Sequence, residues 1–227
     1  MSTRTVLWPV ILLCVLASVP GCASEGKSRW DYRTQGEVQL SGKNYQAAAD
    51  NFKRYLDIEP GNYEVRYLYG VSLLKLGRST EASEALLTAY SQRPGRSDYA
   101  DAMAEAMIAA GKKDELFRIL RANANDRNTV EDWLRLGRSS LAMGDLDTAQ
   151  VALLTAARVD KGRTAEPQIA LSDLYKSLGR DADAQKRIRM AYYREPYNST
   201  VIQRSRAMGV VLNPGDGVFP EEAEAQP

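Results

Sequence analysis

Residues 63–94 read YEVRYLYGVSLLKLGRSTEASEALLTAYSQRP. Apolar and small residues recur every three or four positions on both sides of Gly77, which is the spacing of two amphipathic helices. Gly77 ends the first helix without strain, because glycine readily adopts the left-handed conformation that follows many helices. Pro94 stops the second helix, because proline cannot continue one. The stretch therefore predicts two helices joined by a tight turn.

The same pattern recurs on both sides of this stretch at a nearly constant period. Pro60 lies 34 residues before Pro94, and Pro196 lies 102 residues, or three periods, after it. Four glycines stand at the position of Gly77, where the first helix of each two-helix stretch is expected to end. They are spaced 34, 33 and 35 residues apart: Gly77, Gly111, Gly144 and Gly179. Periods of this length indicate a repeat protein in which each unit stacks on its neighbours.

In this register the chain resembles an array of tetratricopeptide repeats, which are 34-residue helix-turn-helix units with a characteristic order of Trp, Leu-Gly, Tyr, Ala, Phe, Ala and Pro. Five units align, over residues 29–62, 63–96, 97–129, 130–164 and 165–198. The resemblance implies an all-α fold, a right-handed solenoid of helix-turn-helix units. A small residue on the first helix of a unit lets the second helix approach closely, and four units carry one: Gly36, Gly70, Ala104 and Gly137.

The third unit departs from the pattern. Leu116 stands where the second helix of the family has a small alanine, and Asn123 and Asn128 replace the later alanine and proline. We expect residues 123–128 to form a frayed helix end and a loop, because the segment is rich in Asn. Drift in a tolerant middle repeat explains the departure, and the alternative is a local hinge or an altered contact surface.

Beyond the repeats, the sequence predicts a capping helix and a tail. Ser199 is a suitable N-cap and Gly209 a suitable stop, so residues 199–209 are expected to form the polar helix that shields the end of a solenoid. Residues 210–227 contain a turn-forming stretch and then several glutamates. We expect them to form a disordered acidic tail.

The first 22 residues have the features of a targeting signal. Arg4 precedes an apolar run over 6–17, which has the length of a signal-peptide core and is short for a membrane span. The run ends before Val19-Pro20-Gly21-Cys22, which resembles the bacterial lipoprotein box. The resemblance implies removal of the signal peptide 1–21, lipidation of Cys22 with a diacylglyceryl group and an amine-linked acyl chain such as palmitate, and a lipidated tether over 22–28. The alternative is an ordinary secretory signal with an incidental cysteine.

That resemblance also suggests where in the cell the protein is located. Residue 23 is Ala rather than Asp, which by enterobacterial sorting favours the outer membrane of the bacterial cell envelope, on its periplasmic face. Several buried acyl chains hold a protein at a bilayer essentially permanently, because each methylene contributes about 0.8 kcal/mol.

Composition excludes several functional classes. The chain has 227 residues, no histidine and two cysteines, with 30 Lys and Arg against 29 Asp and Glu. Histidine-based catalysis, a four-ligand zinc site and a disulfide framework are therefore absent. A net charge of +1 gives no pull toward nucleic acid. We expect no enzyme activity, no cofactor, no metal, no small-molecule substrate and no nucleic-acid partner.

In tetratricopeptide proteins the concave face, which the first helices line, is the usual binding surface. Helical spacing places the second, fifth, ninth and twelfth residues of each unit there. On this basis the expected peptide-binding groove contains Trp30, Arg33, Glu64, Tyr67, Asp98, Asp101, Glu105, Glu131, Leu134, Arg138 and Ile169. Its apolar and aromatic members are expected to anchor a partner, and its carboxylates to meet Lys or Arg. The alternative is that each acid belongs to an ordinary solvated helix face.

Two functions follow from the resemblance. The first is a membrane-tethered scaffold that binds a protein or peptide of the cell envelope, for example in assembly of a type IV or Tad-type pilus, a secretin or outer-membrane proteins. The alternative is a structural element whose repeats self-associate without a groove ligand.

Overall fold

The computed structural model describes residues 28–224, with backbone alone for Glu224. Within this range the chain is all-α and contains no strand. The helices are α1 (Arg29–Ser41), α2 (Tyr45–Ile58), α3 (Tyr63–Lys75), α4 (Ser79–Gln92), α5 (Ser97–Ala109), α6 (Lys113–Arg127), α7 (Val130–Ala142), α8 (Leu146–Asp160), α9 (Glu166–Ser177), α10 (Asp181–Arg194), α11 (Ser199–Ala207) and α12 (Glu221–Glu224). No helix in residues 28–224 combines the length and the apolar character that a membrane span requires. The predicted signal peptide and Cys22 lie outside the described residues.

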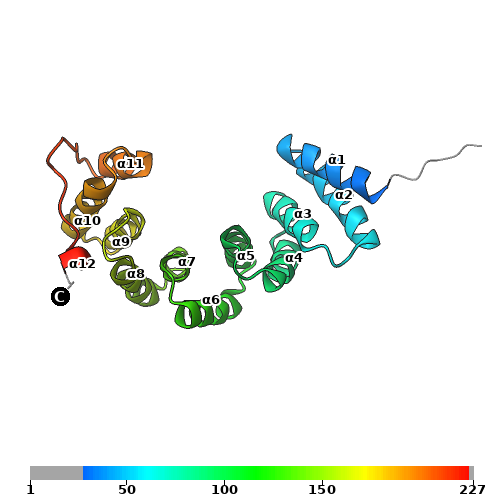
Figure 1. Ribbon diagram of the computed structural model, residues 1–227, viewed down its shortest axis with the longest axis horizontal. Coiled ribbons are helices and arrows are strands. Elements are labelled where there is room, and N and C mark those ends of the chain that lie inside the picture. The colour runs from blue at the N-terminus through cyan, green and yellow to red at the C-terminus, as the bar shows by residue number, and fades with distance from the viewer. Residues whose placement is uncertain (1–27, 225–227) are drawn as a thin grey trace, which may run out of the picture.

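The helices form five consecutive hairpins that follow an arc (Figure 1). The odd-numbered helices α1 to α9 line its inner side, and the even-numbered helices α2 to α10 line its outer side. Each helix contacts mainly the helices before and after it in the chain. This arrangement confirms the predicted all-α solenoid of helix-turn-helix units, with α11 covering its C-terminal end.

Close approach within a hairpin depends on the small residues that the sequence singled out. A Cβ atom added at Gly70 in α3 would lie 2.6 Å from Cγ of Leu86 in α4. One added at Gly36 in α1 would lie 2.5 Å from Cε1 of Phe52 in α2. Any larger side chain at these glycines would push the two helices apart. The turns also follow the expectation, since Gly77 ends α3 with a φ of 75°.

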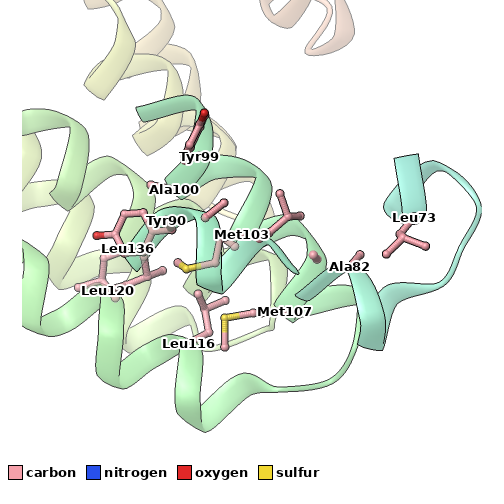
Figure 2. Packing of buried hydrophobic residues seen from close by; sticks show 14 of the residues in the cluster. Leu73, Ala82, Tyr90, Tyr99, Ala100, Met103, Met107, Leu116, Leu120 and Leu136 are labelled. Atoms are coloured by element: carbon pink, nitrogen blue, oxygen red, sulfur yellow. The ribbon is translucent and has the colours of Figure 1, made fainter. Parts of the chain in front are cut away.

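The third hairpin is splayed. α5 packs mainly against α4, α6 packs mainly against α7, and α5 and α6 share fewer contacts than the helices of any other hairpin. Leu116 is fully buried at the position where the family has alanine, and its bulk holds α5 and α6 apart. In Figure 2, Met103 and Met107 extend from α5 into the same apolar cluster as Leu116 and Leu120 of α6.

The expected frayed end over residues 123–128 is wrong. α6 remains helical to Arg127, and Asn128 ends it in the left-handed conformation with a φ of 49°. The Asn123 amide donates a hydrogen bond to the Tyr90 hydroxyl at 2.7 Å, and Arg127 Nη1 donates to the Pro94 carbonyl at 2.6 Å. The polar residues that suggested a loop therefore attach the end of α6 to α4 and its following turn.

The C-terminal region differs from the sequence expectation in two respects. The N-cap of α11 is Asn198 rather than Ser199, because the Asn198 side chain accepts hydrogen bonds from two backbone amides. The described part of the expected disordered tail, residues 210–224, follows a defined path back along the solenoid. The Val218 amide donates to the Arg189 carbonyl at 3.1 Å, and Pro220 is buried. Acidic composition suggested solvation, but the glutamates meet cations on α10.

Candidate protein-binding groove

A groove runs along the inner side of the arc between α5, α7 and α9. It encloses a cavity of about 570 Å³. Its floor is apolar, with Ala104 and Ile108 from α5 and Leu134 and Ala142 from α7. Charged side chains form its rim: Asp101, Glu105, Glu131, Arg135, Arg138 and Glu166. The groove thus offers an apolar base between charged walls, which is the usual composition of a site for a partner side chain.

The structure brings together five of the residues predicted for the groove and places the other six elsewhere. The five that line the cavity are Asp101, Glu105, Glu131, Leu134 and Arg138. Trp30 and Arg33 lie on α1, and Glu64 and Tyr67 lie on α3, so they belong to the N-terminal end of the arc. Asp98 lies at the start of α5 and Ile169 in α9, and neither lines the cavity.

The predicted apolar anchors Leu134 and Ile169 are buried, which corrects their proposed role. Leu134 is 2% exposed and belongs to the core cluster between α7, α8 and α9. Ile169 is 8% exposed and packs with Ile188 and Val201. Both side chains pack against helices of their own or the following unit, so little of their surface is available for contact with a partner. Accessible apolar surface in this groove comes instead from Ile108 and Ala142.

Trp30 and Tyr67 remain accessible, in different ways. Trp30 is 58% exposed, with the Arg29 guanidinium 5.2 Å from its ring centre. The Tyr67 ring stacks on Tyr99 of α5, with centroids 4.3 Å apart and planes 9° apart. Burial raises the pKa of the Tyr67 hydroxyl, and nearby Asp98 adds to the effect. This phenol is therefore neutral at physiological pH and acts as an aromatic surface.

Most carboxylates along the inner side of the arc are neutralised by basic neighbours, of which Arg33 and Arg138 belong to the predicted groove residues. Glu64 pairs with Arg33 at 3.3 Å, and Asp98 pairs with Arg96 at 2.7 Å. The hydrogen bonds from Arg96 lower the pKa of Asp98. Glu105 lies 4.0 Å from Lys75 and Glu166 pairs with Arg138 at 2.9 Å. Among the described residues Glu131 has no ion-pair partner within 4.0 Å, so it is the carboxylate most available to a cationic ligand.

Arg135 is the residue of this site that sequence reasoning missed. Its side chain is 6% exposed and forms part of the groove wall. Its Nε donates to Asp101 at 2.6 Å, Nη1 to Asp132 at 3.1 Å and Nη2 to the Ser97 hydroxyl at 2.7 Å. Asp132 also accepts from Arg127 at 2.7 Å. These bonds fix α5 to α7 across the splayed hairpin and hold the groove walls at a defined separation.

One signal in the sequence pointed to this cluster. Asp101 and Arg135 are 34 residues apart, at the fifth position of one unit and the sixth of the next, so stacking of the two units brings them close together. Arg135 lies outside the second, fifth, ninth and twelfth positions from which the groove was predicted. Within residues 28–224, no three His, Cys, Asp or Glu side chains lie close enough to hold a metal ion.

Comparison with known proteins gives one family and a set of solved structures. Residues 39–106, which run from the end of α1 into α5, match the tetratricopeptide repeat model. No curated protein sequence matches the chain. A thermophilic TPR protein from Thermus thermophilus is similar over 81% of this chain and 100% of that chain, with 22% identity and a TM-score of 0.57.

Two structures of MamA are similar to a comparable extent. MamA 41-end from Desulfovibrio magneticus RS-1 covers 77% of this chain and 98% of that chain, with 16% identity and a TM-score of 0.57. Another MamA protein covers 82% of this chain and 98% of that chain, with 18% identity and a TM-score of 0.55. At these identities the likeness establishes a tetratricopeptide-type fold.

Proposed function

We propose that this protein is an interaction scaffold that holds a segment of a partner protein in the groove between α5, α7 and α9. One observation carries the proposal: an apolar floor lies between charged walls that Arg135 fixes to each other. Tetratricopeptide repeats are a protein-interaction fold, and a preformed groove binds without first paying to order its own walls. The proposed activity is binding rather than catalysis.

The chemistry of the walls defines the partner segment. An apolar side chain fits over Ile108 and Ala142, where accessible carbon surface lines the cavity. A Lys or Arg next to it meets Glu131, which has no ion-pair partner among the described residues, and Glu105, whose own pair is long at 4.0 Å. Fully solvated rim charges contribute mainly to the association rate and to partner choice, whereas the buried apolar contact supplies affinity.

A membrane tether completes the proposal. The lipoprotein-like box ends at Cys22, six residues before Ser28, the N-cap of α1. Six extended residues span about 20 Å, so a lipid on Cys22 keeps the solenoid next to the bilayer. We therefore place the scaffold at the bacterial envelope, on the periplasmic face of the outer membrane. Assembly of a membrane complex such as a type IV or Tad-type pilus or a secretin suits that position.

A bulky substitution in the groove tests the proposal. Ala142 is exposed and lines the cavity, so Ala142→Trp fills the space without disturbing a buried contact. Ala182, exposed at the start of α10 on the outer side of the arc, provides the matched control Ala182→Trp. Proteins captured from membranes by the tagged wild type are compared with those captured by each variant, using quantitative mass spectrometry.

The proposal predicts that Ala142→Trp loses at least one captured protein that the wild type and Ala182→Trp retain. Equal capture by all three proteins would exclude this groove as the binding surface. If the only captured protein is a second copy of this chain, the repeats self-associate, and the structural function described above replaces the scaffold.

A further inference from the structure

A second contact surface lies on the outer side of the arc, where the C-terminal segment 218–224, here called the strap, runs along α8 and α10 (Figure 1). Pro220 lies against Gly162, where an added Cβ would be 2.7 Å from the Pro220 Cβ. The Phe219 ring meets Tyr193 edge-on, with centroids 5.4 Å apart and planes 76° apart. Each of these strap residues therefore has its own place on the solenoid.

The strongest contact of the strap is a buried carboxylate. Glu222 accepts hydrogen bonds from Arg187 Nη1 and, at 3.0 Å, from Gln168 Nε2. The side chains of Arg187 and Glu222 are both 9% exposed, and Gln168 is fully buried. Charge-assisted hydrogen bonds in such a dry setting are stronger than exposed ion pairs and select a carboxylate over neutral groups.

The solenoid arranges these groups through contacts that do not involve the strap. Arg187 Nη1 donates to Gln168 Oε1 at 2.9 Å, and its guanidinium lies 6.0 Å from the Tyr175 ring centre. Among the described residues, the carboxylates within ion-pair distance of Arg187 are Glu221 and Glu222, both from the strap. With the strap in place Arg187 is a largely buried cation, and both of its carboxylate partners come from the strap. A buried cation needs such a counter-charge, because leaving it unpaired is costly. The surface is therefore built to receive an acid.

From this we infer that the outer face of α8 and α10 is a peptide-binding site for a segment with an apolar residue, a proline and two successive carboxylates. The strap, whose residues 218–222 read VFPEE, is its resident ligand in cis. A partner protein that presents the same chemistry displaces the strap and docks on the face opposite the groove. This site uses other residues than the α5–α7–α9 groove, although α9 contributes Glu166 to the groove and Gln168 to the strap site. The inference does not rest on the function proposed above.

The strap is joined to the solenoid in a way that permits its release. One backbone hydrogen bond, from Val218 to Arg189, ties it to α10, and α12 has four residues, too few to be stable alone. The connecting residues turn at 213–216 and include Gly215 with a φ of 100°. A covalently attached ligand acts at an effective concentration in the millimolar range, so a displacing partner must bind more tightly than the free peptide.

The test separates the strap from the folded chain after folding. A protease recognition sequence is inserted between Gly215 and Asp216, in the exposed turn of the full chain. The purified protein is cut, and the released fragment is removed by dialysis. Binding of a fluorescent VFPEEAE peptide is then measured by anisotropy for the cut and the uncut protein, while circular dichroism follows the helices.

The expected result is that the cut protein keeps its helices and binds the peptide, whereas the uncut protein binds it at least about tenfold more weakly because the strap competes. Changing the peptide's second acid, Glu222→Gln, weakens binding by about tenfold or more, since a hydrogen bond to a charged group is lost. The adjacent control, Glu221→Gln, has a smaller effect, because the Glu221 side chain is 52% exposed.

Three results would overturn the inference. The first is a cut protein that stays helical and fails to bind the peptide, or binds the two peptide variants alike. The second is loss of helicity on cutting, which would make the strap a structural cap only. The third is an uncut protein that forms dimers whose dissociation requires strap cleavage, since the natural occupant would then be the strap of a second copy.

Discussion

Arg135 shows how a single side chain connects two repeats. It lies on α7 and donates hydrogen bonds to three residues. Two of them, Ser97 and Asp101, belong to α5. Asp132 accepts from the same guanidinium and is itself 5% exposed. Arg135 and Asp132 are both buried, and each has hydrogen-bond partners for its charge. Removal of either side chain leaves the other as a buried charge with fewer partners.

Arg135→Ala is therefore expected to lower the free energy of unfolding by about 3–5 kcal/mol, because Asp132 loses one of its two cationic partners while remaining buried. Urea unfolding followed by circular dichroism measures the change. Arg138→Ala is the control, since Arg138 is three residues away and forms an exposed ion pair with Glu166. Similar midpoints for the two variants would show that the Arg135 network contributes little.

Residue-level prediction from the sequence succeeded where a residue type has one physical reason. Gly70 was assigned to close helix packing, and Leu86 leaves no room for a Cβ there. It failed for Leu134, because the burial of a fifth-position side chain depends on how far each unit rotates against the next. That rotation arises from the sum of many contacts, and the repeat pattern leaves it open.

At the scale of elements, the third hairpin is the part of the solenoid that departs from regular packing. Leu116 fills the space between α5 and α6 together with Met103 and Met107 (Figure 2). Hydrogen bonds from Asn123 and Arg127 then fasten the end of α6 to the preceding unit. The substitutions that suggested drift thus act together, and the altered packing places α5 and α7 on either side of the groove.

Because Leu116 is part of this packing, replacing it with the alanine typical of the family should not make the third repeat more stable. Leu116→Ala is expected to destabilise the protein by about 2–5 kcal/mol, because it opens a cavity next to the two methionines. Chemical denaturation gives the size of the effect. An unchanged or increased stability would mean that α5 and α6 close to the regular spacing once Leu116 is removed, and that the leucine is drift.

The strap is the element with a predictable response to pH. Burial of the Glu222 carboxyl opposes its ionisation, but hydrogen bonds from Arg187, its own backbone amide and Gln168 outweigh this, so its pKa lies below the ordinary value. A depressed folded-state pKa contributes stability above the unfolded value of about 4.3 and loses it as the pH falls through the folded value. The strap should therefore loosen as the pH falls below the ordinary glutamate pKa and through the lowered pKa of Glu222.

Hydrogen exchange of the Val218 amide, which bonds to Arg189, measures this loosening. We expect its protection to fall in acid earlier than that of amides within α9, once the intrinsic pH dependence of exchange is removed. A Glu222→Gln variant lacks the titrating group and should show low protection at all pH values. Equal pH dependence in the wild type and this variant would show that Glu222 does not hold the strap.

Element prediction was good for α1 to α10 apart from the end of α6, because Gly77, Pro94 and their equivalents mark the ends of helices. It failed for the strap, because Pro220, Glu221 and Glu222 have the composition of a solvated tail. Their partners, among them Gln168 and Arg187, lie 54 and 35 residues from Glu222 in sequence. Only the folded solenoid brings these residues together.

At the scale of the whole molecule, the arc presents two surfaces that face opposite ways. The inner one is the groove of α5, α7 and α9, and the outer one carries the strap on α8 and α10 (Figure 1). The proposed lipid tether at Cys22 would hold both surfaces near a membrane. The two surfaces share α9, which contributes Glu166 to the groove and Gln168 to the strap site.

The tether itself has a direct test. Cys22, which precedes the described residues, is the expected lipidation site, so Cys22→Ser should release the protein from membranes or leave its signal peptide uncut. Membrane fractionation and the intact mass of the protein read out the two outcomes. A variant that is processed and remains in the membrane fraction like the wild type would show that a lipid on Cys22 is not the anchor.

The central claim, that the inner groove holds a partner protein, is tested most directly by photo-crosslinking in living cells. A photoreactive amino acid is placed at Ala142 in the groove and, for comparison, at Ala182 on the outer side. Our account predicts a discrete adduct with another envelope protein from position 142 that is missing from position 182. The same adducts from both positions, or none from position 142, would contradict it.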